Sequence, residues 1–192
     1  SYCEGQDTIS YVALLDEGGK LKYSYGKDYD PYVEKELEEY LEYDRKEGKS
    51  HQGRLLPAVL TEKNHYTQFL VSPAGTTGMD GWAIAAIEMD YVYAKIVKPV
   101  QIGENGYSMV KQLDGTILMH PSQSQIGLDA VDGRKEVYKE YDLQYDDLEQ
   151  WIQDQRENQE GSGLLNSYWW EDSGKPMQST KVISYIQRQI GE

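Results

Sequence analysis

The sequence predicts a mixed α/β (α+β) chain of two tandem modules, each an antiparallel sheet with flanking helices. Three observations lead to this prediction. Short stretches that alternate apolar and polar residues meet at glycine-containing turns, as in hairpins. Amphipathic stretches with helical spacing lie between them. The order of elements in the first half also returns in the second, and a chain of 192 residues has room for two small domains.

The first elements are a predicted hairpin and a predicted helix. Strands over 9–16 and 20–25 flank a turn with two glycines, which can adopt positive φ. Asp30 and Pro31 predict the start of a helix, because Asp is a common N-cap and Pro suits the first turn. Valine, leucine and tyrosine then recur at helical spacing, so we expect this helix to continue to about Gly48.

The remaining elements follow from the same patterns. In the first half we expect strands at 54–60, 65–72 and 82–89, a loop at 73–81 and a short connecting helix at 90–100. In the second half we expect strands at 106–113 and 116–121 around an Asp-Gly turn, a helical stretch at 134–158 ended by Gly161 and Gly163, and strands at 164–170 and 180–190.

The two predicted hairpins align residue for residue. Tyr11 precedes Gly19 by eight residues, and Tyr107 precedes Gly115 by eight, at an offset of 96 residues. The shared order of elements therefore favours an internal duplication. The second copy lacks a counterpart of the strand at 82–89, so we expect the chain to be an excised part of a longer protein.

Charge and cysteine content exclude several classes of protein. The net charge of −14 repels phosphate groups, so neither nucleic acid nor anionic lipid is an expected partner. The single cysteine, Cys3, excludes an internal disulfide framework and a cysteine-based zinc site. No apolar run approaches the roughly 20 residues that span a bilayer.

No catalytic pattern stands out in the sequence. The three histidines have no metal-binding spacing, and nucleophile elbows and phosphate-binding loops are absent. We therefore predict no catalytic residue, metal or cofactor. An enzyme fragment such as a hydrolase stays open as an alternative. So does a surface module that binds no small ligand.

Three stretches resemble the double form of the Cache family of PAS-like extracytoplasmic bacterial sensors. They are WAIAAIEMDYVYAKIV at 82–97, GENGYSMVKQLDGTILMHPSQSQIG at 103–127, and the strand pair GSG–YWW within 161–190. The second is the most specific, with its Gly-Tyr, Asp-Gly and His-Pro pairs. The resemblance implies two PAS-like modules, a membrane-distal one at 1–97 and a membrane-proximal one at 98–192.

The resemblance also implies a function. Such domains bind small molecules, often amino acids or carboxylates, outside the cytoplasmic membrane and signal to a cytoplasmic module. We expect a membrane-anchored parent protein, most readily a histidine kinase, with a diguanylate cyclase or a chemotaxis receptor as alternatives. Family members often dimerise through a stalk helix that this sequence lacks, so a homodimer of the parent protein is an open expectation.

Five residues form the expected ligand site of the distal module. The resemblance places Glu88 where the family has an acid that binds a ligand amine. Strand alternation puts Trp82 on the same face as Glu88. Arg54 suits a ligand carboxylate, although a surface Arg paired with an acid is the simpler interpretation. Tyr66 and Gln68 share a strand face and offer hydrogen bonds.

A secondary pocket is expected in the proximal module. Its candidates are His120, Tyr168 and Trp170. His120 can act as a pH sensor or as a buried imidazole that fixes a strand end, and the second interpretation is favoured. The aromatic run at 168–170 fills the core more often than it lines a pocket.

Overall fold

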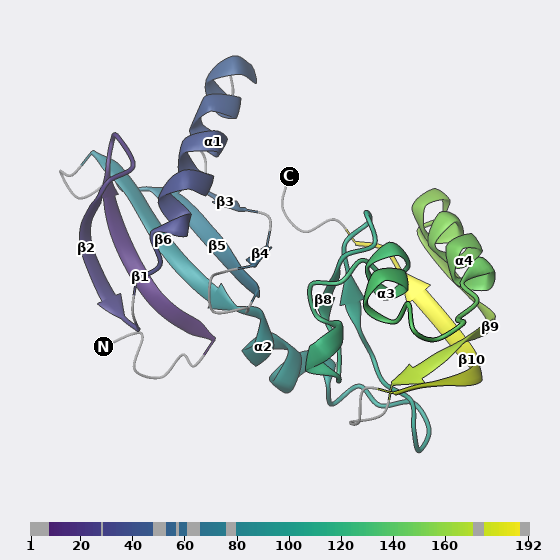
Figure 1. Cartoon of the computed structure of the whole chain (residues 1–192). Helices are drawn as coiled ribbons and strands as arrows, with labels where there is room; N and C mark the ends of the chain where they lie inside the picture. Colours follow the sequence, from purple (N-terminus) through teal and green to yellow (C-terminus); the bar gives the residue numbers. More distant parts are fainter. Residues whose placement is uncertain are drawn as a thin grey trace. The chain divides into compact units, whose positions relative to one another are not determined.

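The computed structural model describes residues 8–27, 29–47, 53–56, 58–60, 66–75, 80–170 and 175–188. Contacts along the chain divide it into two compact units. Unit 1 covers the chain up to Lys95, and unit 2 runs from Ile96 to Gln189. Each unit combines antiparallel strands with helices (Figure 1), which confirms the predicted fold class. Within the described residues, no helix is long and apolar enough to cross a membrane.

Unit 1 is a six-stranded antiparallel sheet covered on one face by a helix. Its strands are β1 (Ile9–Asp16), β2 (Leu21–Gly26), β3 (Arg54–Leu55), β4 (Val59–Leu60), β5 (Tyr66–Pro73) and β6 (Gly81–Glu88). The order across the sheet is β2-β1-β6-β5-β3, and β4 also pairs with β5. The predicted strand at 54–60 is therefore two short strands. The sequence has a proline between them, and proline cannot donate to a strand ladder.

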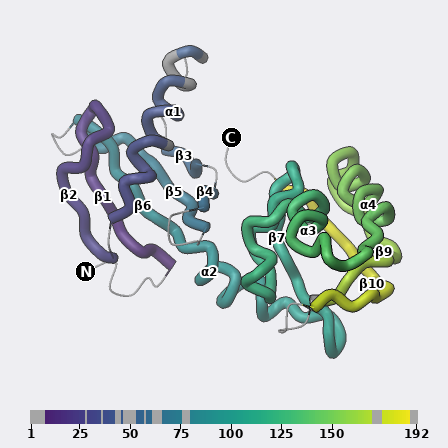
Figure 2. Tube along the Cα trace, viewed as in Figure 1, coloured from purple at the N-terminus to yellow at the C-terminus, as the bar shows by residue number. Residues whose placement is uncertain are grey.

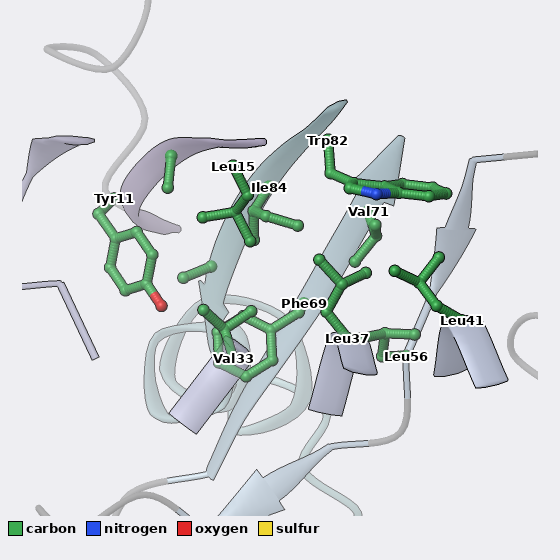
Figure 3. Packing of buried hydrophobic residues seen from close by; sticks show 12 residues of the cluster. Tyr11, Leu15, Val33, Leu37, Leu41, Leu56, Phe69, Val71, Trp82 and Ile84 are labelled. Carbon is green, nitrogen blue, oxygen red and sulfur yellow. The ribbon is translucent and has the colours of Figure 1, made fainter. Parts of the chain in front are cut away.

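Helix α1 (Tyr32–Glu47) forms where the sequence predicts it. The Asp30 carboxylate accepts a hydrogen bond from the Tyr32 N–H at 3.0 Å, as an N-cap does. Val33, Leu37 and Leu41 are buried at intervals of four residues. Figure 3 shows these side chains facing the sheet residues Tyr11, Leu15, Phe69, Val71, Trp82 and Ile84. Together they form the apolar core of unit 1.

The hairpin turns use glycine as expected. Gly19 has φ +82° and Gly115 has φ +111°, a backbone region that favours glycine. In the first turn, the Asp16 carboxylate accepts hydrogen bonds from the N–H groups of Gly18 and Lys20, both at 3.0 Å. In the second, Asp114 accepts one from the Thr116 N–H at 2.8 Å.

The segment after β6 is helical, as predicted. It comprises α2 (Met89–Val92) and the π-helix η2 (Tyr93–Val97), and it ends before Pro99.

In unit 2 the described strands form two separate antiparallel pairs (Figure 2). One joins β7 (Val110–Lys111) to β8 (Ile117–Met119), and the other joins β9 (Glu160–Trp170) to β10 (Pro176–Ile186). The predicted strands at 106–113 and 116–121 are thus shorter, and those at 164–170 and 180–190 are extended or shifted toward the N-terminus. A 3-10 turn, η3 (Gln123–Gln125), follows β8.

The single helical stretch predicted at 134–158 is wrong. The structure has two helices, α3 (Asp132–Val137) and α4 (Asp146–Glu157). Between them, Tyr138 and Tyr145 turn into the core, and the Gln144 N–H donates to the Tyr168 hydroxyl at 2.6 Å. Two aspartates then open α4, where negative charge favours a helix N-terminus.

The glycines expected to end this helix lie instead within β9. A Cβ at Gly161 would stand 2.7 Å from Cε1 of Tyr185, and one at Gly163 would stand 2.8 Å from Cζ2 of Trp151. Both positions are glycine because aromatic rings pack directly against the strand.

Candidate functional site

The carboxylate of Glu88 lies at the end of β6 and binds an ammonium group. Lys27 Nζ donates to both Glu88 oxygens, at 3.0 and 3.1 Å. Both side chains are accessible, with 64% of Lys27 and 32% of Glu88 exposed. An ion pair this exposed contributes about 0–1 kcal/mol. The Glu88 carboxylate can therefore exchange one ammonium partner for another.

Strand register places polar and aromatic groups beside Glu88. Thr67 pairs directly with Glu88, and Tyr11 pairs with Ala86, two residues earlier on the same face. Residues related in this diagonal way have Cα atoms about 7–8 Å apart, within reach of an aromatic side chain. Tyr11 also stacks edge-on against Tyr29, with ring centroids 5.4 Å apart.

The two tyrosines keep their protons over the whole physiological range. Burial, followed by the charge of Asp30, raises the pKa of Tyr11. Burial, followed by a hydrogen bond to the Glu34 carboxylate, raises the pKa of Tyr29. Their hydroxyls donate to the Asp30 carbonyl oxygen at 3.5 Å and to Glu34 Oε1 at 3.0 Å. This end of unit 1 thus combines neutral phenols with one exchangeable carboxylate.

Trp82 shares the Glu88 face, as alternation predicts, but lies at the other end of β6. Six residues separate the two, which is about 20 Å along a strand. Trp82 is buried against Val71 and Leu41 in the core of unit 1 (Figure 3). The structure does not bring Trp82 and Glu88 together.

Tyr66 and Gln68 lie on the opposite face of the sheet from Glu88. The register Thr67↔Glu88 puts Thr67 on the Glu88 face, and alternation then turns its neighbours away. Tyr66 is buried, and Gln68 Nε2 donates to the Leu56 carbonyl oxygen at 3.1 Å.

Arg54 begins β3 and lies away from Glu88. It pairs with Val71, which in turn pairs with Ile84, four residues before Glu88. Its guanidinium carbon lies 5.0 Å from the ring centroid of Tyr40, a cation–π contact.

In unit 2, His120 is a buried neutral imidazole. Its Nδ1 accepts a hydrogen bond from the Ser122 N–H at 3.0 Å, and its Nε2 lies 3.2 Å from the Tyr107 hydroxyl. Burial, followed by the charge of Arg134, lowers the pKa of His120 to about 3. These contacts support the interpretation of His120 as a buried group that fixes a strand end.

A buried polar chain runs beside His120. Arg134 Nε donates to Gln125 Oε1 at 2.7 Å, and Gln125 Nε2 donates to the Tyr138 hydroxyl at 2.7 Å. Gln125 is fully buried, and Arg134 is 5% exposed. Burial lowers the pKa of Arg134, but a guanidinium stays charged in proteins. Unit 2 therefore carries a fixed positive charge in its interior.

Lys181 of β10 lies close to this charge. Its ammonium donates to the Tyr168 carbonyl oxygen and lies 5.9 Å from the Tyr107 ring centroid and 5.8 Å from that of Trp169. Burial, followed by the charge of Arg134, lowers the pKa of Lys181 to about 8.

The expected secondary pocket falls in the same region. Tyr168 is buried, with its ring centroid 6.0 Å from that of Tyr145. The Lys181 ammonium donates a hydrogen bond to the Tyr168 carbonyl oxygen. Its charge also contributes to the lowered pKa of His120. The side chain of Trp170 lies outside the described part of the structure.

Sequence reasoning did not propose Tyr11 or Lys27 in unit 1, or Arg134, Tyr145 and Lys181 in unit 2, as site residues. The excess of 17 tyrosines over one phenylalanine was a general signal for polar rings in the core. It could not say which tyrosines lie beside a charge.

Two other features of the described residues bear on binding. No group of three or more His, Cys, Asp or Glu among them could hold a metal ion. A shallow hollow also lies on the face of the unit 1 sheet opposite α1. Its lining is mostly apolar and includes Val12, Leu14, Tyr23, Leu70, Ala83 and Ala85.

Solved structures with the same fold include three extracellular domains. One is an extracellular ligand binding receptor from Desulfohalobium retbaense DSM5692, with 14% identity and a TM-score of 0.54. The others are extracellular domains assigned to histidine kinases. They are vpHK1S-Z8, with 13% identity and a TM-score of 0.60, and mmHK1S-Z2, with 15% and 0.51.

The matched regions differ in extent. They cover 86% of this chain and 28% of the Desulfohalobium receptor chain. For the two histidine kinase domains they cover 95% and 93% of this chain, and 71% and 72% of the other. This chain thus spans less than a third of the first receptor's length. It spans most of each of the two extracellular domains assigned to histidine kinases. A comparison with curated proteins found no match.

The family model dCache_2, described as a Cache domain, matches residues 85–189, which is more than half of the chain. This range contains the motif at 103–127 and the strand pair β9–β10. The chain belongs to the Cache family of sensor domains.

Proposed function

We propose that this chain is the extracytoplasmic ligand-sensing domain of a bacterial transmembrane receptor, with a histidine kinase as its output. Membership of the Cache family and the fold shared with histidine kinase extracellular domains support this proposal. A chemoreceptor or a diguanylate cyclase as the output module remains the alternative. Unit 1 is the membrane-distal module in this proposal and holds the ligand.

The ligand class that unit 1 suits best is a small primary amine, such as an amino acid. The observation that supports this ligand class is that both carboxylate oxygens of Glu88 accept hydrogen bonds from the Lys27 ammonium, at 3.0 and 3.1 Å. Lys27 is a stand-in for the ligand's ammonium and leaves when the ligand binds. Because the pair is exposed, its loss costs little, and the strand register places Thr67 and Tyr11 next to Glu88.

Of the other predicted residues, Arg54 could contribute only to a larger ligand. Arg54 and Glu88 are separated by four residues of strand register, which is about 13 Å along the strands. An α-amino acid is far shorter than this distance. A ligand that contacts both would need its carboxylate and amine at opposite ends of an extended molecule.

Amine binding can be tested by calorimetry on the whole chain with a panel of L-amino acids and n-propylamine. Glu88→Gln removes the negative charge and should abolish binding. Lys27→Met removes the competing ammonium and should tighten binding several-fold. Lys22→Met serves as the matched control, because Lys22 forms a similar exposed pair with Asp16 at 3.0 Å. Unchanged binding by Glu88→Gln would overturn the assignment of this site.

A hydrolase is not favoured by the contacts of His120. Its two ring nitrogens face the Ser122 backbone N–H and the Tyr107 hydroxyl. Neither contact is the serine hydroxyl or carboxylate that a catalytic histidine of that class requires.

A further inference from the structure

Lys181 of β10 is a half-buried amine without an acidic partner among the described residues. An ammonium group has three N–H donors. Here it donates to the Tyr168 carbonyl oxygen and otherwise faces the rings of Tyr107 and Trp169. Other described lysines do pair with a carboxylate, namely Lys22, Lys27, Lys35, Lys46, Lys135 and Lys139. No such carboxylate holds the proton of Lys181 in the described part of the chain.

Strand register explains how the Lys181 amine comes to lie beside aromatic rings. Lys181 pairs with Leu165 of β9, and alternation puts Ser167 and Trp169 on the same face. Leu165 and Ser167 are buried, whereas Trp169 and Lys181 are half-buried. The aliphatic stem of Lys181 therefore starts from the buried part of the strand pair. The amine stands at the rim, where solvent and small solutes reach it.

The charges that act around Lys181 are positive. Arg134 of α3 is 5% exposed and carries a fixed charge. His120 is buried and neutral, and the charge of Lys181 contributes to its lowered pKa. Burial, followed by the charge of Arg134, lowers the pKa of Lys181 to about 8. About a tenth of the Lys181 amines are then neutral at pH 7, against fewer than about one in a thousand for an ordinary lysine.

A lysine amine in such surroundings is a nucleophile. Lysines that form imines with carbonyl compounds are activated by loss of hydration or by a neighbouring cation. Lys181 has both, the first from its rings and strand neighbours and the second from Arg134. We infer that Lys181 is a covalent modification site, where its amine forms an imine with a small aldehyde.

The reaction consumes one amine and one aldehyde and yields one imine and one water. The Nζ lone pair attacks the carbonyl carbon, and the electrons of the C=O π bond move to the oxygen. This oxygen takes up the first of the two N–H protons. The hydroxyl then leaves as water with the second N–H proton, and the C=N bond forms. No oxidant or reductant is needed, and water reverses the reaction.

A small aldehyde fits the surroundings of Lys181 better than carbon dioxide, which also reacts with neutral amines. The imine is less basic than the amine, so its formation removes a positive charge near Arg134. The apolar body of the aldehyde lies against the half-buried rings of Tyr107 and Trp169. Carbon dioxide would give a carbamate, whose negative charge is repelled by the negative faces of these rings.

The test is incubation of the whole chain with propionaldehyde at pH 7.0, followed by sodium borohydride and peptide mass spectrometry. Borohydride reduces each imine to a stable secondary amine, so all lysines are compared in one sample. We expect at least tenfold more adduct at Lys181 than at Lys98 and Lys175, two exposed lysines of unit 2. This excess should shrink as the pH is raised to 10, because ordinary lysines gain neutral amine over that range.

Two variants complete the test. Lys181→Met keeps the length of the side chain and should lower the total trapped aldehyde, whereas Lys175→Met should not. Near-UV circular dichroism shows that both are folded. Equal adduct at Lys181 and Lys98 at pH 7.0 would overturn the inference, and so would equal totals for Lys181→Met and wild type. Glu88→Gln should carry the Lys181 adduct like wild type, so failure of this site is distinguishable from failure of the amine site at Glu88.

Discussion

At the scale of single residues, the imidazole of His120 is held neutral by its burial and by the positive charge of Arg134. Its pKa of about 3 lies below the ordinary value of 6.5. We expect the His120 signals in a two-dimensional NMR titration to stay those of a neutral ring down to about pH 4. His120→Gln identifies these signals by their loss. A midpoint near pH 6.5 would show instead that His120 can sense pH in the neutral range.

The same shift has a consequence for stability. Because the pKa is lower in the folded state, only the unfolded chain takes up this proton between about pH 6.5 and pH 3. Because of His120, the free energy of unfolding therefore decreases as the pH falls through this window. Above about pH 6.5, His120 does not make the free energy of unfolding depend on pH.

Lys181 produces a dependence of the same sign at alkaline pH. Its folded-state pKa of about 8 lies below the usual 10.5, so between these values the unfolded chain binds more protons. The free energy of unfolding should rise through this window by about 1–3 kcal/mol in the wild type. Lys181→Met should lack this contribution and be more stable at pH 7. Urea unfolding at pH 7, 9 and 10.5 measures it, with Lys175→Met as control, and parallel curves for wild type and Lys181→Met would contradict it.

Residue-level prediction from sequence succeeded within a strand and failed between strands. Alternation correctly placed Trp82 and Glu88 on one face. It could not relate that face to Gln68, because this depends on which residue of β5 pairs with Glu88, a long-range contact. Lys181 and Arg134 were missed for a similar reason. In sequence, a lysine in a polar strand and an arginine in a short helix have the pattern of solvent-exposed residues.

At the scale of elements, Gly81 fixes how β6 begins beside β1. It has φ +149°, and a Cβ here would lie 2.1 Å from the Leu15 carbonyl oxygen. The clash is with backbone and cannot be relieved by a side-chain rotation. We expect Gly81→Ala to destabilise the chain by about 2–4 kcal/mol, measured by urea unfolding. Gly75→Ala is the matched control, because its Cβ would meet nothing within 4 Å. Equal stability of the two variants would show that the β1–β6 pairing can shift.

Local signals predicted elements well where one residue type determines the backbone. Asp30 and the turn glycines Gly19 and Gly115 act as expected. The same reasoning failed for Gly163, which was expected to end a helix but lies inside β9 against the Trp151 ring. A glycine required for close ring packing has the same sequence signal as a helix breaker, and only tertiary contacts distinguish the two.

At the scale of the whole molecule, the repeat at an offset of 96 residues identified similar local order in the two units but not similar sheets. The first hairpin, β1–β2, is part of a six-stranded sheet, whereas the described strands of unit 2 pair two by two. Hairpin turns are determined by a few adjacent residues. The extent of a sheet depends on contacts between distant segments, which the repeat does not encode.

The net charge of −14 makes stability sensitive to salt in a predictable direction. Like charges repel in the compact state, and raising the salt from about 0.01 M to about 0.15 M shortens the Debye length from about 30 Å to about 8 Å. Screening also weakens exposed ion pairs such as Lys22–Asp16 and Lys27–Glu88. Each of these contributes at most about 1 kcal/mol, and part of that survives at short range. Repulsion summed over the surface should therefore be the larger effect.

We expect sodium chloride to raise the free energy of unfolding over this range by on the order of 1 kcal/mol, about 2–4 °C in Tm for a chain of this size. Lys181→Met is the background for this measurement, so that chloride bound near Lys181 cannot produce the shift. Choline chloride in place of sodium chloride tests whether the cation binds specifically, and the two salts should act alike. A Tm that falls with salt would mean that ion pairs outweigh repulsion, so that the acidic surface is balanced locally despite its net charge.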